Sequence, residues 1–256
     1  MQYSVCVNAV FSRLPVPEAI ARVREAGLDT YEFWGWWGLD LDAVKKAQQA
    51  HGLKLAAMCT RMVPLNVPDR RAEYIDGLKE SLAVAQKLDC RTLISQVGPE
   101  QADMTRKEQH QSIVEGLRAC VPLLEAAGVT LVIEPLNTLI NHRGYYLARS
   151  DEAFDIAKEV GSPHVKVLFD VYHQQVTEGN LINNMTQNVE WIGHIHIAGH
   201  PGRHEILGRN EIHYPSVLDA LQEAGYTGAV GLEYIPTKDP VQGVRELLAA
   251  IPLPRS

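Results

Sequence analysis

The chain has 256 residues, 46% of them hydrophobic and 21% charged, with a net charge of -7 at pH 7. This composition excludes a disordered or fibrous chain, and the length is typical of one barrel of alternating strands and helices. The acidic balance and the lack of a long Lys/Arg run argue against nucleic acid or a membrane surface as a partner. The N-terminal residues lack a signal-peptide pattern, so we expect a cytoplasmic protein.

Eight short apolar runs alternate with longer segments of helical periodicity, which indicates repeated strand–helix units and a parallel sheet. The expected strands are residues 3–8, 30–33, 54–59, 92–96, 130–134, 165–170, 193–198 and 229–233. The expected helices include residues 16–26, 41–51, 70–88, 106–126 and 215–224, with a short polar tail at 252–256. Eight units favour a single (β/α)8 TIM barrel over residues 1–256; an open doubly wound sheet is the alternative, because strand order cannot be read from one sequence.

Polar residues end four consecutive expected strands. Glu134 closes TLVIE, Asp170 closes VKVLFD, His196 lies in IGHIHIA and Glu233 closes AVGLE. In barrels of this kind the active site lies at the C-terminal ends of the strands, so these side chains should converge on one mouth. Any one of them alone has an ordinary explanation, as a helix cap or a hydrogen-bonded core residue. Together they predict one site.

Three carboxylates and an imidazole in a barrel mouth would repel one another without a cation. The predicted ligands Glu134, Asp170, His196 and Glu233 suit a divalent metal, Mn²⁺ first and Mg²⁺ or Co²⁺ as alternatives. Such a metal can chelate a carbonyl and the neighbouring hydroxyl and stabilise an enediolate. Glu134 and Glu233 are also the candidate proton-transfer residues, which predicts isomerase or epimerase chemistry on a small sugar or hydroxy-keto acid.

Several motifs carry a family resemblance: IEPLNT, VKVLFDVYHQQVTEGNL, GHIHIAGHPGRHE and ALQEAGYTGAVGLEY. With these the chain resembles the xylose isomerase-like barrel superfamily, and most closely the hydroxypyruvate isomerase family. The resemblance implies the same four metal ligands and the same two catalytic glutamates. It also implies that His173 and Arg203 contact substrate oxygens, where an arginine can hold a carboxylate bidentately.

The substrate class is left open by two positions. Members of the hydroxypyruvate isomerase family often carry glutamine where this chain has His196, and a histidine there is similar to the ketose 3-epimerases. Ile140, however, stands where those epimerases tend to have a substrate-binding glutamate. We therefore favour a hydroxypyruvate isomerase-like reaction over a 3-epimerase. A metal-dependent phosphodiesterase or endonuclease, which would need a basic rim, and a non-catalytic sugar-binding protein are the more remote alternatives.

Other residues near the predicted mouth have open roles. Of three tryptophans after the second strand, Trp34 is our candidate for the pocket, while all three could also form a lid or a homo-oligomer contact. His194 is interpreted as a hydrogen-bonded barrel residue. Glu32 either supports the metal site or lies at the surface. Asn137 and Arg61 lie at comparable loop positions where they could touch substrate, but a solvated loop residue is the more common case, and Arg61 is left out of the predicted site. The scattered cysteines are expected to be reduced thiols.

Overall fold

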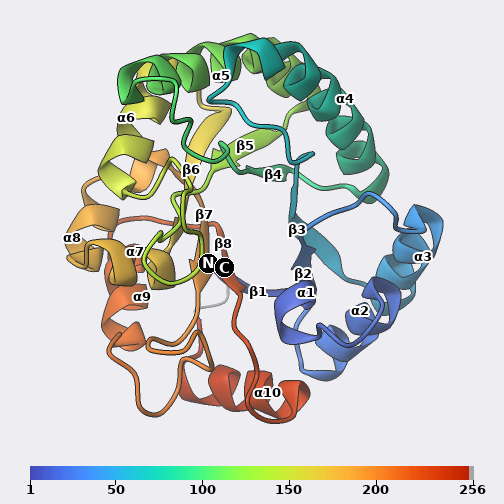
Figure 1. Ribbon diagram of the computed structural model, residues 1–256. Coiled ribbons are helices and arrows are strands. Elements are labelled where there is room, and N and C mark those ends of the chain that lie inside the picture. Colours follow the sequence, from blue (N-terminus) through green and yellow to red (C-terminus); the bar gives the residue numbers. More distant parts are fainter. Residues whose placement is uncertain (254–256) are drawn as a thin grey trace.

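A computed structural model describes residues 1–253, so the last three residues of the predicted tail, 254–256, lie outside the described residues. Eight parallel strands close into a barrel in sequence order, with β1 hydrogen-bonded to β8 (Figure 1). The strands are β1 Gln2–Cys6, β2 Thr30–Phe33, β3 Lys54–Cys59, β4 Thr92–Ser95, β5 Thr130–Ile133, β6 Val165–Asp170, β7 Ile192–Ile197 and β8 Ala229–Leu232. The predicted (β/α)8 barrel is confirmed, and the open sheet is excluded.

Helices form a ring outside the barrel (Figure 1). They are α1 Val7–Val10, α2 Val16–Glu25, α3 Leu41–His51, α4 Arg71–Leu88, α5 Arg106–Ala127, α6 Ser150–Val160, α7 Val171–Thr177, α8 Leu181–Thr186, α9 Tyr214–Glu223 and α10 Pro240–Ala250, with 3-10 turns η1 Pro68–Arg70 and η2 Val189–Trp191. Helix α2 shows why they pack there. Its buried residues Val16, Ala19, Ile20 and Val23 recur at helical spacing and make one apolar stripe. None of the helices within residues 1–253 has the length and apolar character needed to cross a membrane.

The predicted element boundaries were wrong by one or two residues at several ends. The first strand stops at Cys6 rather than Asn8, because Val7–Val10 turns into a short helix whose Asn8 side chain accepts the backbone N–H of Trp34 at 2.8 Å. Likewise, β5 and β8 end just before Glu134 and Glu233. The backbone N–H groups of these two residues still donate to the neighbouring strands, so both side chains remain fixed at the strand ends.

Strand alternation decides which side chains fill the barrel. A cluster of five buried residues on β3 to β6 packs together in its interior: Ala57, Cys59, Ile94, Val132 and Leu168. Successive side chains of a strand point to opposite faces, so residues two apart share a face. Glu134 and Asp170 follow Val132 and Leu168 at this spacing, and therefore point inward one layer higher, at the C-terminal mouth.

Candidate active site

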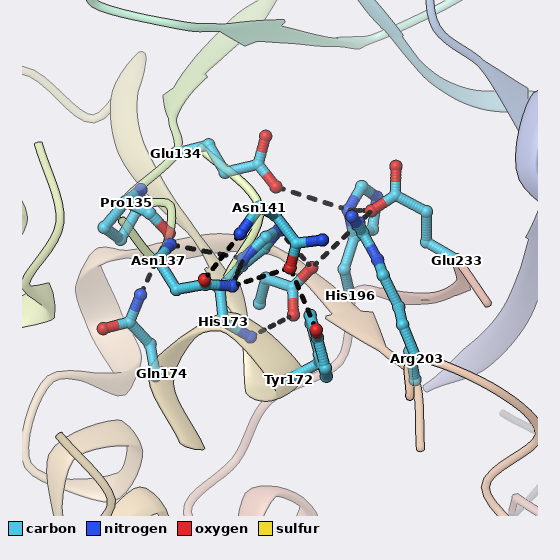
Figure 2. A network of polar contacts seen from close by, with 12 residues as sticks. Glu134, Pro135, Asn137, Asn141, Tyr172, His173, Gln174, His196, Arg203 and Glu233 are labelled. Atoms are coloured by element: carbon cyan, nitrogen blue, oxygen red, sulfur yellow. Dashed lines mark hydrogen bonds and ion pairs between the residues drawn. The ribbon is translucent and has the colours of Figure 1, made fainter. Parts of the chain in front are cut away.

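The structure brings the four predicted ligands together. Ligand atoms of Glu134, Asp170, His196 and Glu233 all lie within 4.8 Å of one another, and all four residues are buried. Figure 2 shows Glu134 and Glu233 with His196 between them. The Nδ1 atom of His196 lies 3.7 Å from Oε1 of Glu134 and 3.4 Å from Oε2 of Glu233. One oxygen of Asp170 caps helix α7 by accepting the backbone N–H of His173 at 2.9 Å, which leaves its other oxygen toward the cluster.

Glu32 lies behind His196 within ion-pair distance. One oxygen of Glu32 lies 3.3 Å from Nε2 of His196, and the other contacts Nε2 of His194 at 2.7 Å. Both interpretations made from the sequence are settled: His194 is a hydrogen-bonded barrel residue, and Glu32 is buried behind the site rather than at the surface. A carboxylate on one ring nitrogen orients the other nitrogen, here Nδ1, toward a ligand.

Gly231 on β8 makes room for this arrangement. It is paired with His196 across the sheet, and a Cβ atom built on it would lie 2.0 Å from Oε1 of Glu32 and 2.6 Å from Cδ2 of His196. Any side chain at this position would therefore push Glu32 away from the histidine. The sequence offers no signal for this role other than a glycine inside an expected strand.

The charges of the cluster are strongly coupled. Burial raises the pKa of Asp170, with Arg203 opposing the shift. Burial also acts to raise the pKa of Glu233, but His196 and Arg203 outweigh it and hold that pKa well below its usual range. The same balance acts on His196: burial lowers its pKa, and Glu233 and Glu32 bring it well above the ordinary value. The ionised form of these buried carboxylates is therefore stabilised by the positive charge nearby.

This donor set fits a divalent cation. Three carboxylates and one imidazole nitrogen supply hard oxygen ligands and a single nitrogen, a combination suited to Mn²⁺, Mg²⁺ or Co²⁺. Within residues 1–253, Nδ1 of His196 is buried and makes no hydrogen bond although two carboxylates face it. Glu134, Asp170, His196 and Glu233 would be the residues that hold the ion.

The three predicted substrate contacts surround the same cluster. Arg203 forms an ion pair with Glu233, and its guanidinium lies 5.4 Å above the ring of Tyr172. Trp34 donates its indole N–H to Oε1 of Glu233 at 2.6 Å. Arg203, Trp34 and His173 line a cavity of about 570 Å³ at the barrel mouth. Its other walls include Met62, Val63, Pro64 and Leu136.

Two residues near the site were not predicted correctly. Asn137 was expected to be solvated, but it is fully buried and contacts His173, because its side chain closes the turn that follows β5. Gln96 received no role, yet its amide donates to Oε2 of Glu134 at 3.2 Å. The position of Gln96 in the sequence could have indicated this role, because Gln96 ends the fourth expected strand just as Glu134 ends the fifth. The four cysteines are free and buried, as predicted.

The chain is a closed (β/α)8 barrel with a buried cluster of carboxylates and a histidine at its C-terminal mouth. Residues 20–252 match the family described as xylose isomerase-like TIM barrel, and the chain belongs to that family. The putative hydroxypyruvate isomerase of Xenopus laevis is 30% identical over 95% of this chain and 94% of its own length. The 2-oxo-tetronate isomerase of Cupriavidus necator is 35% identical over 66% of this chain and 65% of its own.

Among solved structures, AP endonuclease, family 2, from Brucella melitensis is similar with a TM-score of 0.91 and 28% identity, covering 97% of this chain and 98% of that one. The family predicted from the sequence motifs and the predicted isomerase class are confirmed.

Proposed function

We propose that this protein is a metal-dependent isomerase that interconverts a short 2-keto-3-hydroxy acid and its aldehyde isomer through an enediolate. The observation that carries the proposal is the pair of buried glutamates, Glu134 and Glu233, on either side of His196 Nδ1. A bound divalent cation would supply Lewis-acid stabilisation of negative charge on the substrate oxygens. Mn²⁺ is the ion we propose, with Mg²⁺ or Co²⁺ as alternatives.

The glutamates would carry the proton transfer. One takes the proton from the hydroxyl-bearing carbon beside the carbonyl, and a carboxyl group returns a proton to the former carbonyl carbon while a second proton moves between the two oxygens. Asp170 and His196 would hold the ion, and Arg203, His173 and Trp34 would line the bound substrate. Which glutamate acts first is left to experiment.

The charge balance of the site supports an acidic substrate. Ionised Glu134, Asp170 and Glu233 carry three negative charges, which a divalent cation and Arg203 would together offset. Glu32 carries a further negative charge, but it lies behind His196 and does not line the cavity. With the charges that face the cavity offset, the mouth can accept the single carboxylate of a keto acid without a large repulsion. The two relatives described above, a putative hydroxypyruvate isomerase and a 2-oxo-tetronate isomerase, are named for the same class of compound.

Proton exchange in deuterated water tests this function. The protein, stripped with a chelator and reloaded with Mn²⁺, is incubated with hydroxypyruvate, a four-carbon keto acid and a set of ketoses, and the quenched products are followed by NMR after metal removal. We expect deuterium at carbon, with an aldehyde product from hydroxypyruvate and the 3-keto isomer from the four-carbon acid, all abolished by the chelator and restored by metal. A product ketose inverted at C3 would instead show that the protein is a 3-epimerase. Exchange that survives complete metal removal, or no exchange with any compound, would overturn the proposal.

The remaining expectations stay predictions: one domain over residues 1–256, a cytoplasmic location, no nucleic-acid partner and a homo-oligomer.

A further inference from the structure

Asn137 directs two donors at one nitrogen of His173. Its backbone N–H lies 3.2 Å from Nδ1 of His173, and its side-chain Nδ2 lies 2.6 Å from the same atom (Figure 2). Both residues are fully buried. A backbone N–H can only donate, so Nδ1 must accept through its lone pair.

The orientation of the Asn137 amide is fixed by its own surroundings. Its Oδ1 accepts the backbone N–H groups of Ile140 at 3.0 Å and Asn141 at 3.2 Å. Its Nδ2 must therefore face the other way, where it meets Oδ1 of Asn141 at 3.1 Å as well as the histidine. The Tyr172 hydroxyl donates to the same Asn141 oxygen at 2.9 Å, which holds that oxygen as an acceptor. This amide orientation follows from the whole network.

The imidazole ring itself is clamped. The rings of Tyr172 and His142 lie with their centroids 5.3 Å and 5.1 Å from that of His173, both steeply tilted against it. The ring has little freedom to turn over and exchange its two nitrogens. A neutral imidazole that accepts at Nδ1 carries its proton on Nε2.

The Nε2 donor of His173 has no hydrogen-bond partner among the described residues. Within residues 1–253 it is buried and makes no hydrogen bond, and the Asp170 Oδ2 atom at 3.7 Å is too far to accept one. A buried donor without an acceptor is costly, and His173 lines the cavity at the mouth. Its Nε2–H is therefore placed to meet an oxygen that arrives with a ligand.

We propose that Asn137 is a positioning residue that fixes His173 in the Nε2–H form, so that His173 donates to the substrate oxygen that gains negative charge as the proton leaves carbon. This inference rests on the proposed isomerase function. A preorganised neutral donor stabilises charge that develops in the transition state, so its effect belongs to kcat more than to KM. The oxygen bound there must be an acceptor, such as a carbonyl oxygen.

The substitution Asn137→Asp tests the idea with almost no change in shape. One carboxylate oxygen can still accept from Ile140 and Asn141, but the other presents an acceptor to Nδ1 in place of the amide donor. The backbone N–H of residue 137 still faces Nδ1 from 3.2 Å, but a charged acceptor at the 2.6 Å position of Nδ2 is the stronger partner. At pH 8 we therefore expect the ring proton to move to Nδ1, and kcat to fall about 100-fold with little change in KM. Asn141→Asp is the matched control: it makes the same chemical change in the same network without touching His173, and activity should change less than about threefold.

Two measurements separate positioning from a simple folding defect. Nitrogen-15 spectra of metal-free wild-type and variant protein report which ring nitrogen carries the proton, with the His173 signals assigned by their loss in His173→Gln. Introduced into His173→Gln, Asn137→Asp should have almost no further effect on kcat, because the two residues act as a unit. An unprotonated Nε2 in the wild type, or an undiminished effect in the double variant, would overturn the inference. The spectra need no activity, so this outcome is distinct from failure of the proposed function.

Discussion

The two halves of the barrel mouth differ sharply in chemistry. At or just after the ends of strands β5 to β8 lie four ionisable residues, the proposed metal ligands Glu134, Asp170, His196 and Glu233. At the ends of β1 to β4 stand Cys6, Trp34, Cys59 and Gln96, none of which is charged. Apart from Glu32 on β2, which lies behind His196, the first half of the barrel thus presents neutral walls and donors at the mouth and is called the neutral half. The second half presents the ionisable groups and is called the charged half.

The neutral half nevertheless orients the charged half. Gln96 holds Oε2 of Glu134, while Oε1 of that residue faces His196. In the same way Trp34 holds Oε1 of Glu233, while Oε2 faces His196. Each glutamate therefore has one oxygen fixed by a neutral N–H and one directed at the cluster. Neutral donors achieve this without adding to the charge that must be buried.

The largest effect should come from removing the charge of either glutamate. Glu134→Gln and Glu233→Gln each keep the side-chain shape but cannot accept the substrate proton, so we expect kcat to fall by at least about 1,000-fold. The exposed Glu223→Gln on α9 is the control and should retain activity. Steady-state kinetics with Mn²⁺ in excess measure the change. A loss below tenfold in both site variants would mean that the charged half does not carry the proton transfer.

A second test concerns stability against pH in the charged half. Burial lowers the pKa of His173 to about 3, with Arg203 adding to the effect. The folded pKa lies below the unfolded value of about 6.5, so the stability held by the neutral ring is complete above pH 6.5 and is lost as the pH falls toward 3. Between pH 7 and pH 5 this amounts to about 2 kcal/mol.

Urea unfolding of the metal-free protein measures this pH-dependent part of the free energy of unfolding. The wild type should lose about 2 kcal/mol more than His173→Gln on going from pH 7 to pH 5. Cys59→Ala, from the neutral half, should follow the wild-type pH dependence. Identical slopes for the wild type and His173→Gln would show that His173 protonates as easily in the folded state as in the unfolded chain.

The site residues of the charged half were also the ones that could be predicted from the sequence. Carboxylates and histidines ending apolar strands are conspicuous, and parallel strand order brings their ends together, so Glu134, Asp170, His196 and Glu233 could be predicted as a cluster. The barrel followed from eight repeats of one pattern. Closure itself could not be deduced, because the pairing of β1 with β8 joins residues far apart in the chain.

The supporting residues could not be found in this way. Gln96 and Asn137 belong to residue types that are common in loops, and their roles depend on which atom each amide meets in space. Gly231 matters only because Glu32 and His196 approach each other beside it. Such contacts depend on distances of tenths of an ångström across neighbouring strands, which no residue pattern encodes.

Removing a donor from the neutral half should have a moderate effect. Trp34→Phe retains an aromatic wall but deletes the N–H that holds Oε1 of Glu233. A hydrogen bond to a charged group contributes about 1.5–3 kcal/mol, and the partial exposure of Trp34 places the expected effect near the lower limit, about tenfold in kcat/KM. Trp37→Phe provides the matched control. Equal losses in the two variants would mean that ring packing, rather than the hydrogen bond, orients Glu233.

The smallest effect is expected at Cys59, which reaches the cavity from β3. Burial raises the pKa of its thiol, and the charges of Glu134 and Glu233 raise it further, so the group stays protonated and is a poor metal ligand. Cys59→Ala should therefore change kcat/KM and Mn²⁺ affinity by less than about threefold, while stability falls by about 1 kcal/mol as the sulfur leaves a packed interior.

Cys120→Ala on α5 gives the same loss of a buried sulfur away from the mouth. If Cys59→Ala weakens Mn²⁺ binding tenfold or more and Cys120→Ala does not, β3 contributes a ligand and the neutral half has a direct part in holding the ion. If both leave Mn²⁺ affinity unchanged, the proposed ligands all come from β5–β8, and the first four strands act on the chemistry through the hydrogen bonds of Trp34 and Gln96, the contact of Glu32 with His196 and the shape of the cavity.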